Sequence, residues 1–192
     1  SSFGGMVYYT SPDRSSLLEQ LQSDSIKKVC DADWKDLTIE RLPEIPNFTL
    51  LVGWTGQVAI TDSLIQATEK KRKVETDSAF YKEFLTKSHT IVQGLQSAWN
   101  KQDIPALQEG IRSNRALLNE YAQEMQLEIE TPALQTLCDI AEQNGACAKT
   151  SGAGGGDCGI CFTQNETQRQ QIETQWAKAQ IQVLPLTIAE AW

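Results

Sequence analysis

A glycine-rich run in the last quarter of the sequence limits the possible folds more than any other feature. Five of the eight residues from Gly152 to Gly159 are glycine, and each glycine adds to the backbone entropy that is lost on folding. A tight hairpin between two strands needs only one or two of them. The surplus favours a loop whose N–H groups turn toward a bound anion. Composition alone leaves open a second interpretation, in which the run is a flexible or packing hairpin.

The flanking residues distinguish this loop from two common phosphate loops. Residues Ala146–Lys149 and Cys158–Thr163 are expected to be strands on either side of it. No Gly-Lys-Ser or Gly-Lys-Thr closes the run, so it is not a Walker A loop. A strand rather than a helix follows it, which excludes the Rossmann fingerprint. Asp157 beside glycine is more typical of a turn than of a catalyst.

A second candidate segment follows the apolar run Phe48–Val52, which is expected to be a central strand buried on both faces. It reads Gly-Trp-Thr-Gly at 53–56 and leads to Thr61 or Asp62, either of which can cap a helix. Helix N-termini attract anions, and Thr55, Thr61 and Ser63 offer hydroxyl donors. Ordinary helix capping remains the alternative explanation of this segment.

The order of the expected elements indicates an α+β fold. Strands are predicted at 5–9, 37–42, 48–52, 146–149, 158–163 and 181–188, and helices beginning near 13, 61, 76, 103, 131 and 166. The first helix is expected to continue through Ile26 and Val29. This order favours a mainly antiparallel sheet with helices on one face. The final strand-turn-strand-helix-strand section fits half of a ferredoxin-like domain.

Charge and composition exclude several classes of function. The chain has 17 Lys and Arg against 25 Asp and Glu, a formal net charge of −8, which argues against a general nucleic-acid binder. The apolar runs are too short to span a membrane, and no secretory signal pattern is visible. An odd set of five scattered cysteines is typical of a reduced, cytoplasmic protein. Cys158 and Cys161 lie in an expected strand, and His89 is the only histidine, so no metal or redox site is predicted.

Three motifs resemble one known family. Ser-Gly-Ala-Gly-Gly-Gly-Asp-Cys-Gly at 151–159 is similar to the C-terminal glycine motif of the GHMP kinases. Its Asp-Cys-Gly ending resembles the bacterial phosphomevalonate kinase branch. Leu-Leu-Val-Gly-Trp-Thr-Gly at 50–56 and Ser-Phe-Gly-Gly-Met-Val-Tyr-Tyr at 2–9 resemble the same branch. The motifs extend over nearly the whole chain in the order of the family.

The resemblance implies an ATP-dependent, Mg²⁺-requiring transfer of phosphate to 5-phosphomevalonate, in the mevalonate route to isoprenoids. It implies the end of an N-terminal kinase domain at 1–45 and the ferredoxin-like C-terminal domain at 46–192. No residue of this chain is expected to be catalytic or to bind a metal. Substrate and phosphate contacts are expected from Lys149, Ser151, Gly152, Ala153, Gly154, Gly155, Gly156, Asp157, Trp54, Thr55 and Thr61.

Two features of the family are missing from the chain. Its ATP-phosphate loop, of the Pro-x-x-x-Gly-Leu-Gly-Ser-Ser type, does not occur, and the first acidic residue, Asp13, comes after the expected site of the catalytic Asp. We therefore expect a C-terminal half that is inactive alone and whose partner is its own N-terminal half. The pair Gln57-Val58, where some relatives have Lys-Pro or a similar pair, leaves a charged contact there in doubt.

Two other interpretations remain open at this stage. The chain could belong to another GHMP enzyme, such as mevalonate kinase or the diphosphomevalonate decarboxylase. It could instead be a non-catalytic interaction module whose helices at 76–126 bind a partner. Partners other than ATP, the substrate and the N-terminal half are not expected, and the oligomeric state stays open.

Overall fold

The structure is a computed structural model that describes residues 4–56, 78–152 and 154–189. The chain divides into two compact units, Ser1–Glu44 with Ile188–Trp192, and Ile45–Thr187. The predicted domains at 1–45 and 46–192 stay a prediction. Within the first unit, the Gly5 N–H donates to the Ala189 carbonyl at 2.7 Å.

The first unit is a small α+β arrangement. Strands β1 (Val7–Thr10) and β2 (Thr38–Arg41) pair antiparallel, and α1 (Arg14–Ser23) and α2 (Ile26–Cys30) lie between them in the chain. Our prediction of one continuous helix through Ile26 and Val29 is wrong. Asp24 is extended and ends α1, and the Ser25 side chain caps the separate helix α2.

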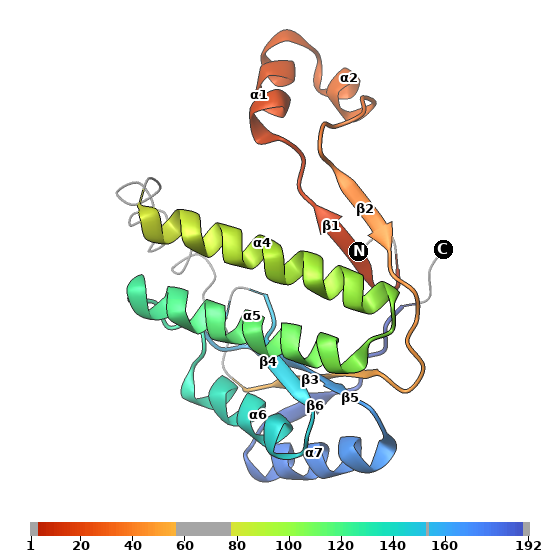
Figure 1. The fold of residues 1–192 in the computed structure, drawn as a ribbon, viewed down its shortest axis with the longest axis vertical. Helices are drawn as coiled ribbons and strands as arrows, with labels where there is room; N and C mark the ends of the chain where they lie inside the picture. Colours follow the sequence, from red (N-terminus) through yellow and green to blue (C-terminus); the bar gives the residue numbers. More distant parts are fainter. Residues whose placement is uncertain (1–3, 57–77, 153, 190–192) are drawn as a thin grey trace. The chain divides into compact units, whose positions relative to one another are not determined.

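The second unit contains a four-stranded sheet, and it is antiparallel as the sequence predicts. Strands β3 (Thr49–Trp54), β4 (Cys147–Thr150), β5 (Cys158–Thr163) and β6 (Gln182–Leu184) lie in the order β4-β5-β3-β6, with every neighbouring pair antiparallel. With α6 (Pro132–Gln143) and α7 (Glu166–Lys178) they give the βαββαβ order of a ferredoxin-like fold (Figure 1). The last strand is shorter than predicted, because Leu186 turns back to bond the Leu184 carbonyl.

One face of this sheet is closed by α6 and α7. The main core joins Leu51 and Cys161 of the sheet to Leu137 of α6 and to Trp176 of α7. The Trp176 indole N–H donates to the Leu137 carbonyl at 3.0 Å, which ties the two helices together. Prediction of helices on one face is therefore confirmed for this pair.

Two further helices, α4 (Ala79–Asn100) and α5 (Ile104–Glu124), form an antiparallel hairpin inserted between β3 and α6 (Figure 1). Asp103 caps α5 by accepting the Ala106 N–H. Trp99 packs edge-on against Phe48 and Phe162. Phe162 follows the core residue Cys161 in β5, and consecutive side chains of a strand point to opposite faces of the sheet. This aromatic cluster therefore lies on the sheet face opposite α6 and α7.

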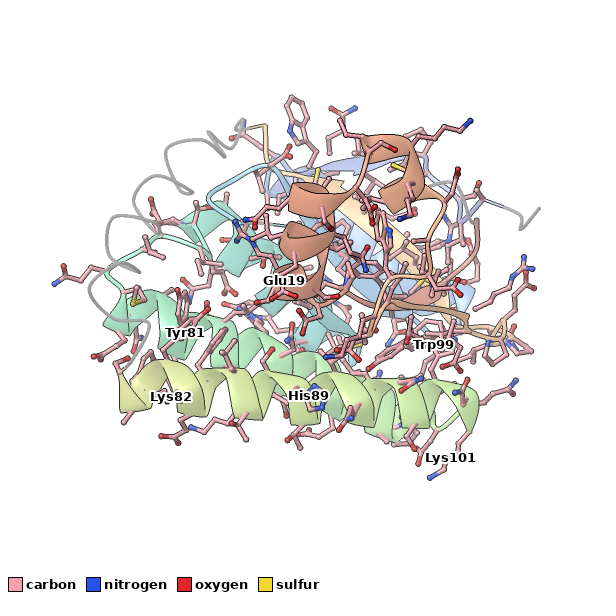
Figure 2. All side chains as sticks on the ribbon, turned by 90° about the horizontal axis from the view of Figure 1, so that it is seen from above. Glu19, Tyr81, Lys82, His89, Trp99 and Lys101 are labelled. Atoms are coloured by element: carbon pink, nitrogen blue, oxygen red, sulfur yellow. The ribbon has the colours of Figure 1, made fainter. Side chains whose placement is uncertain are left out.

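The long helix α4 carries the only histidine of the sequence. His89 is exposed midway along it, with Tyr81 and Lys82 near its beginning and Trp99 near its end (Figure 2). The helix predicted near 61 lies outside the described residues. Among the helices that the structure describes, none has both the length and the apolar character needed to cross a bilayer.

Candidate functional site

The glycine-rich loop, residues 151–157, joins β4 to β5. The Ser151 N–H donates to the Cys158 carbonyl at 2.9 Å and closes the base of the loop. The loop glycines have positive φ angles, and so does Asp157, at 60°. This is the turn role that the sequence predicted for Asp157. Ala153 lies outside the described residues. The φ angles of the loop glycines are 66° for Gly152, 75° for Gly154, 79° for Gly155 and 122° for Gly156.

One side of the loop rests on the backbone of Ile129. The Gly155 N–H donates to the Ile129 carbonyl at 2.8 Å. A Cβ on Gly154 would lie 2.4 Å from the same carbonyl oxygen, a distance that real Cβ atoms do not reach. The contact to Ile129 therefore requires glycine at 154, in addition to the requirement of its positive φ.

The other side of the loop is held by the end of β3. Thr55 donates twice to the Asp157 carbonyl, from its N–H at 2.9 Å and from its hydroxyl at 3.0 Å. Trp54, half-buried, lies opposite Cys158 in the β3–β5 register. The structure thus brings together the two segments that the sequence singled out, although they lie about a hundred residues apart. Thr61 falls outside the described residues.

Several loop amides are left without an acceptor. The N–H groups of Gly152, Gly154 and Gly156 donate to no other residue of the described chain. Gly154 and Gly156 are buried, and Gly152 is exposed. Unpaired N–H groups in such a turn create a local positive potential. The loop can therefore offer hydrogen bonds to an anion without losing any that it makes internally.

Lys149 places a cation at the entrance to the loop. Its Nζ donates to the Thr150 carbonyl at 2.8 Å, one residue before Ser151. Burial lowers the pKa of Lys149, and within the described ranges no carboxylate is near enough to offset that effect. An anion bound beside it would raise that pKa again.

The cysteines next to the loop are poor candidates for chemistry. Burial raises the pKa of Cys158, whose thiol contacts the Asp157 carboxylate at 3.6 Å. Cys161 lies in the core on the opposite sheet face, and burial raises its pKa further. Neither thiol favours the thiolate form that nucleophiles and metal ligands need. No cluster of three His, Cys, Asp or Glu side chains that could hold a metal occurs in the part of the chain that the structure describes.

Sequence reasoning missed Ile129. Its contribution is a backbone carbonyl, which leaves no trace in residue type, spacing or periodicity. It also missed one purpose of the glycines. Gly159 pairs with Gly53 in the sheet, and a Cβ on either would come within 3.0 Å of Leu137. Gly159 therefore serves packing rather than a ligand.

Comparison with known proteins places this loop in context. The family described as "GHMP kinases C terminal" matches residues 93–182, which include the loop. The chain is 36% identical over 191 residues to the phosphomevalonate kinase of Streptomyces sp. (strain CL190), covering 98% of this chain and 50% of that protein.

Solved structures agree with the sequence match. A protein from Listeria innocua superposes with a TM-score of 0.92 at 32% identity, over 99% of this chain and 53% of its own. Streptococcus pneumoniae phosphomevalonate kinase, in complex with phosphomevalonate and AMPPNP, superposes with a TM-score of 0.79 at 28% identity, over 94% and 51%. The chain spans about half the length of these relatives. Residues 93–182 therefore resemble the C-terminal domain of the GHMP kinases.

Proposed function

We propose that this chain forms the C-terminal half of a phosphomevalonate kinase. In that reaction an oxygen of the substrate's phosphate bonds to the γ-phosphorus of ATP while the γ-phosphorus–oxygen bond to ADP breaks, which gives 5-diphosphomevalonate and ADP. The observation that carries the proposal is the glycine-rich loop, which is hydrogen-bonded to Ile129 on one side and to Thr55 on the other and keeps unpaired backbone amides. Its support is the likeness to a phosphomevalonate kinase over nearly the whole chain.

The proposed task of the loop is to receive phosphate charge. Phosphoryl transfer depends mainly on positioning and electrostatic stabilisation. Fixed N–H donors suit that task, because they need no reorganisation when charge develops. We assign phosphate contacts to the amides of Gly152, Gly154 and Gly156, with the Ser151 hydroxyl and the Lys149 ammonium as further donors.

The remaining candidates have supporting roles in this proposal. Thr55 and Asp157 hold each other, so they shape the loop rather than bind the substrate by those groups. Half-buried Trp54 lies beside them. Ala153 and Thr61 keep the roles that the resemblance implies, as contacts to phosphate.

ATP and Mg²⁺ are the expected cofactors. The unpaired amides fit the phosphates of ATP. The described residues hold no carboxylate cluster that fits Mg²⁺, so we assign no step to the metal on this chain. We propose that the N-terminal half of the protein supplies its ligands, together with the ATP loop and the catalytic Asp.

The test is a substrate comparison with the protein expressed from its complete gene. Purified protein is given ATP and either 5-phosphomevalonate or mevalonate, and ADP release is followed while mass spectrometry identifies the product. We expect 5-diphosphomevalonate from the first and negligible turnover of the second. Preference for mevalonate would assign the chain to a different GHMP kinase, and no phosphorylation of any such acceptor would favour an interaction module.

A loop variant links the activity to the site. Replacing Ser151 by Ala removes one hydroxyl from an anchored loop, and loss of such a donor costs on the order of 10²-fold in kcat. The matched control is Ser113→Ala on α5, whose hydroxyl faces the carboxylate of Glu109 at the surface. Equal activity in both variants would remove Ser151 from the site.

A further inference from the structure

The short segment 129–131 makes a hydrogen bond at each of its ends. Its first residue, Ile129, holds the glycine-rich loop through its carbonyl. Its last residue, Thr131, caps α6 by accepting the Leu134 N–H at 3.4 Å. Between them lies Glu130, whose side chain takes part in neither of these hydrogen bonds and belongs to an ion-pair network.

That network is nearly buried and has forked geometry. Arg115 of α5 donates to both carboxylate oxygens of Glu130, at 2.8 and 2.5 Å. Asn119, one turn further along α5, adds a third hydrogen bond at 3.2 Å. The Glu130 side chain is 7% exposed and that of Arg115 is 17% exposed. Arg115 also reaches Asp139 of α6 at 3.0 Å, so one guanidinium joins α5, the segment and α6.

Stability alone is a weak reason for such an arrangement. A buried ion pair can often be replaced by apolar side chains at no loss of stability. What a bidentate pair provides is a fixed position and orientation. Here the fixed residue is the direct neighbour of Ile129, whose carbonyl oxygen leaves Gly154 no room for even a Cβ. Any shift of that carbonyl would therefore be transmitted to the loop.

We infer that Arg115 and Glu130 are positioning residues that set the geometry of the glycine-rich loop through the Ile129 carbonyl. They touch no substrate. They keep the Gly155 N–H bonded and thereby orient the neighbouring amides that remain available to phosphate. The effect on catalysis rests on the proposed function, whereas the effect on the loop does not.

The loop can be observed directly by amide hydrogen exchange of the protein expressed from its complete gene. Arg115→Met and Glu130→Gln should each speed exchange at Gly155 by about tenfold, the scale of a coupling within one network. The amides of β4 and β5 should stay as protected as in the unaltered protein. The matched control is Arg169→Met, which breaks two ion pairs on α7 that do not reach the loop. Unchanged exchange at Gly155 in both variants would overturn the inference.

A paired substitution separates positioning from stability. Arg115→Met with Glu130→Met replaces the whole ion pair by apolar side chains, and its thermal stability should recover toward that of the unaltered protein. Exchange at Gly155 should nevertheless remain about tenfold faster, because the apolar pair has no forked geometry. Recovery of the loop together with stability would show that the ion pair only stabilises, and would refute the inference.

Kinetics provide the last readout. In a protein that turns over 5-phosphomevalonate, the paired variant should lower kcat by about tenfold while the KM of the substrate changes little. Conversely, an unchanged kcat with a mobile loop would overturn the catalytic part of the inference. If the unaltered protein shows no kinase activity, the proposed function fails, and the exchange result still decides whether these residues hold the loop.

Discussion

Two groups of glycines in this chain look alike in the sequence and differ in the structure. Gly53 and Gly159 face each other in the sheet, where their lack of a side chain lets Leu137 of α6 pack directly on the strands. The loop glycines have positive φ and line a turn whose amides are partly unpaired. The first group allows close packing in the core, whereas the second allows a turn that leaves backbone amides unpaired. Glycine content alone therefore does not locate a binding site.

The largest effect is expected at Gly154. Substitution by Ala places a Cβ 2.4 Å from a backbone oxygen at a positive φ, so it combines overpacking with left-handed strain. We expect a loss of about 2–4 kcal/mol in unfolding free energy and nearly complete loss of the proposed kinase activity. Chemical unfolding and turnover measure the two. A stable, active Gly154→Ala variant would contradict the tight contact with Ile129.

Gly159→Ala should separate stability from activity. Its φ is ordinary, and the clash is with the flexible methyl groups of Leu137, so we expect a cost of about 1–3 kcal/mol. Folded molecules should keep their turnover. Adding Leu137→Ala makes room for the new methyl group, so the two substitutions should cost less together than the sum of the single effects. Strict additivity in this cycle would argue against direct packing.

Lys149→Met tests whether the positive charge of the Lys149 side chain near the loop lowers the unfolding free energy of the protein. Because burial lowers the pKa of Lys149 in the folded chain, the charged side chain destabilises the fold at neutral pH. We expect Met to raise the unfolding free energy by about 0.5–2 kcal/mol and to weaken protection of the protein by added diphosphate.

The same substitution has a defined pH dependence. Between the lowered pKa of folded Lys149 and its ordinary value of 10.5, the unfolded chain binds more protons than the folded one. Stability of the unaltered protein therefore rises with pH across that window. The advantage of Lys149→Met should be largest at pH 7 and vanish above pH 10.5. An advantage that is independent of pH would point to packing instead.

Among the glycine substitutions, the smallest effect on stability is expected at Gly152. A Cβ there would meet nothing within 4 Å, so Gly152→Ala should cost only the strain of positive φ, about 1–2 kcal/mol. Gly152→Asn should cost less, because Asn tolerates this conformation. If the exposed amide binds phosphate, both variants should raise the KM for a phosphorylated substrate. Unchanged KM values would limit the anion site to the buried part of the loop.

Regular patterns made most of the second unit predictable. The strand after the loop and the caps at Asp103 and Thr131 occur where residue type and periodicity indicate them. The hydrogen bonds between Thr55 and Asp157 were not predicted, because a contact across 102 positions leaves no local signal. The break between α1 and α2 depends on the extended backbone of Asp24 and the Ser25 cap, which the apolar periodicity does not reveal. The end of the last strand depends on the backbone hydrogen bond from the Leu186 N–H to the Leu184 carbonyl, which side-chain patterns do not encode.

The contact between Thr55 and Asp157 also bears on how the molecule folds. Its partners are separated by 102 positions, and closing so long a loop is entropically slow compared with forming local helices. The helical hairpin of α4 and α5 lies inside that interval and needs only neighbouring residues to form. Helical signal should therefore return before the proposed anion site forms during refolding, so that the proposed capacity to bind phosphate would be among the last properties the newly folded chain acquires.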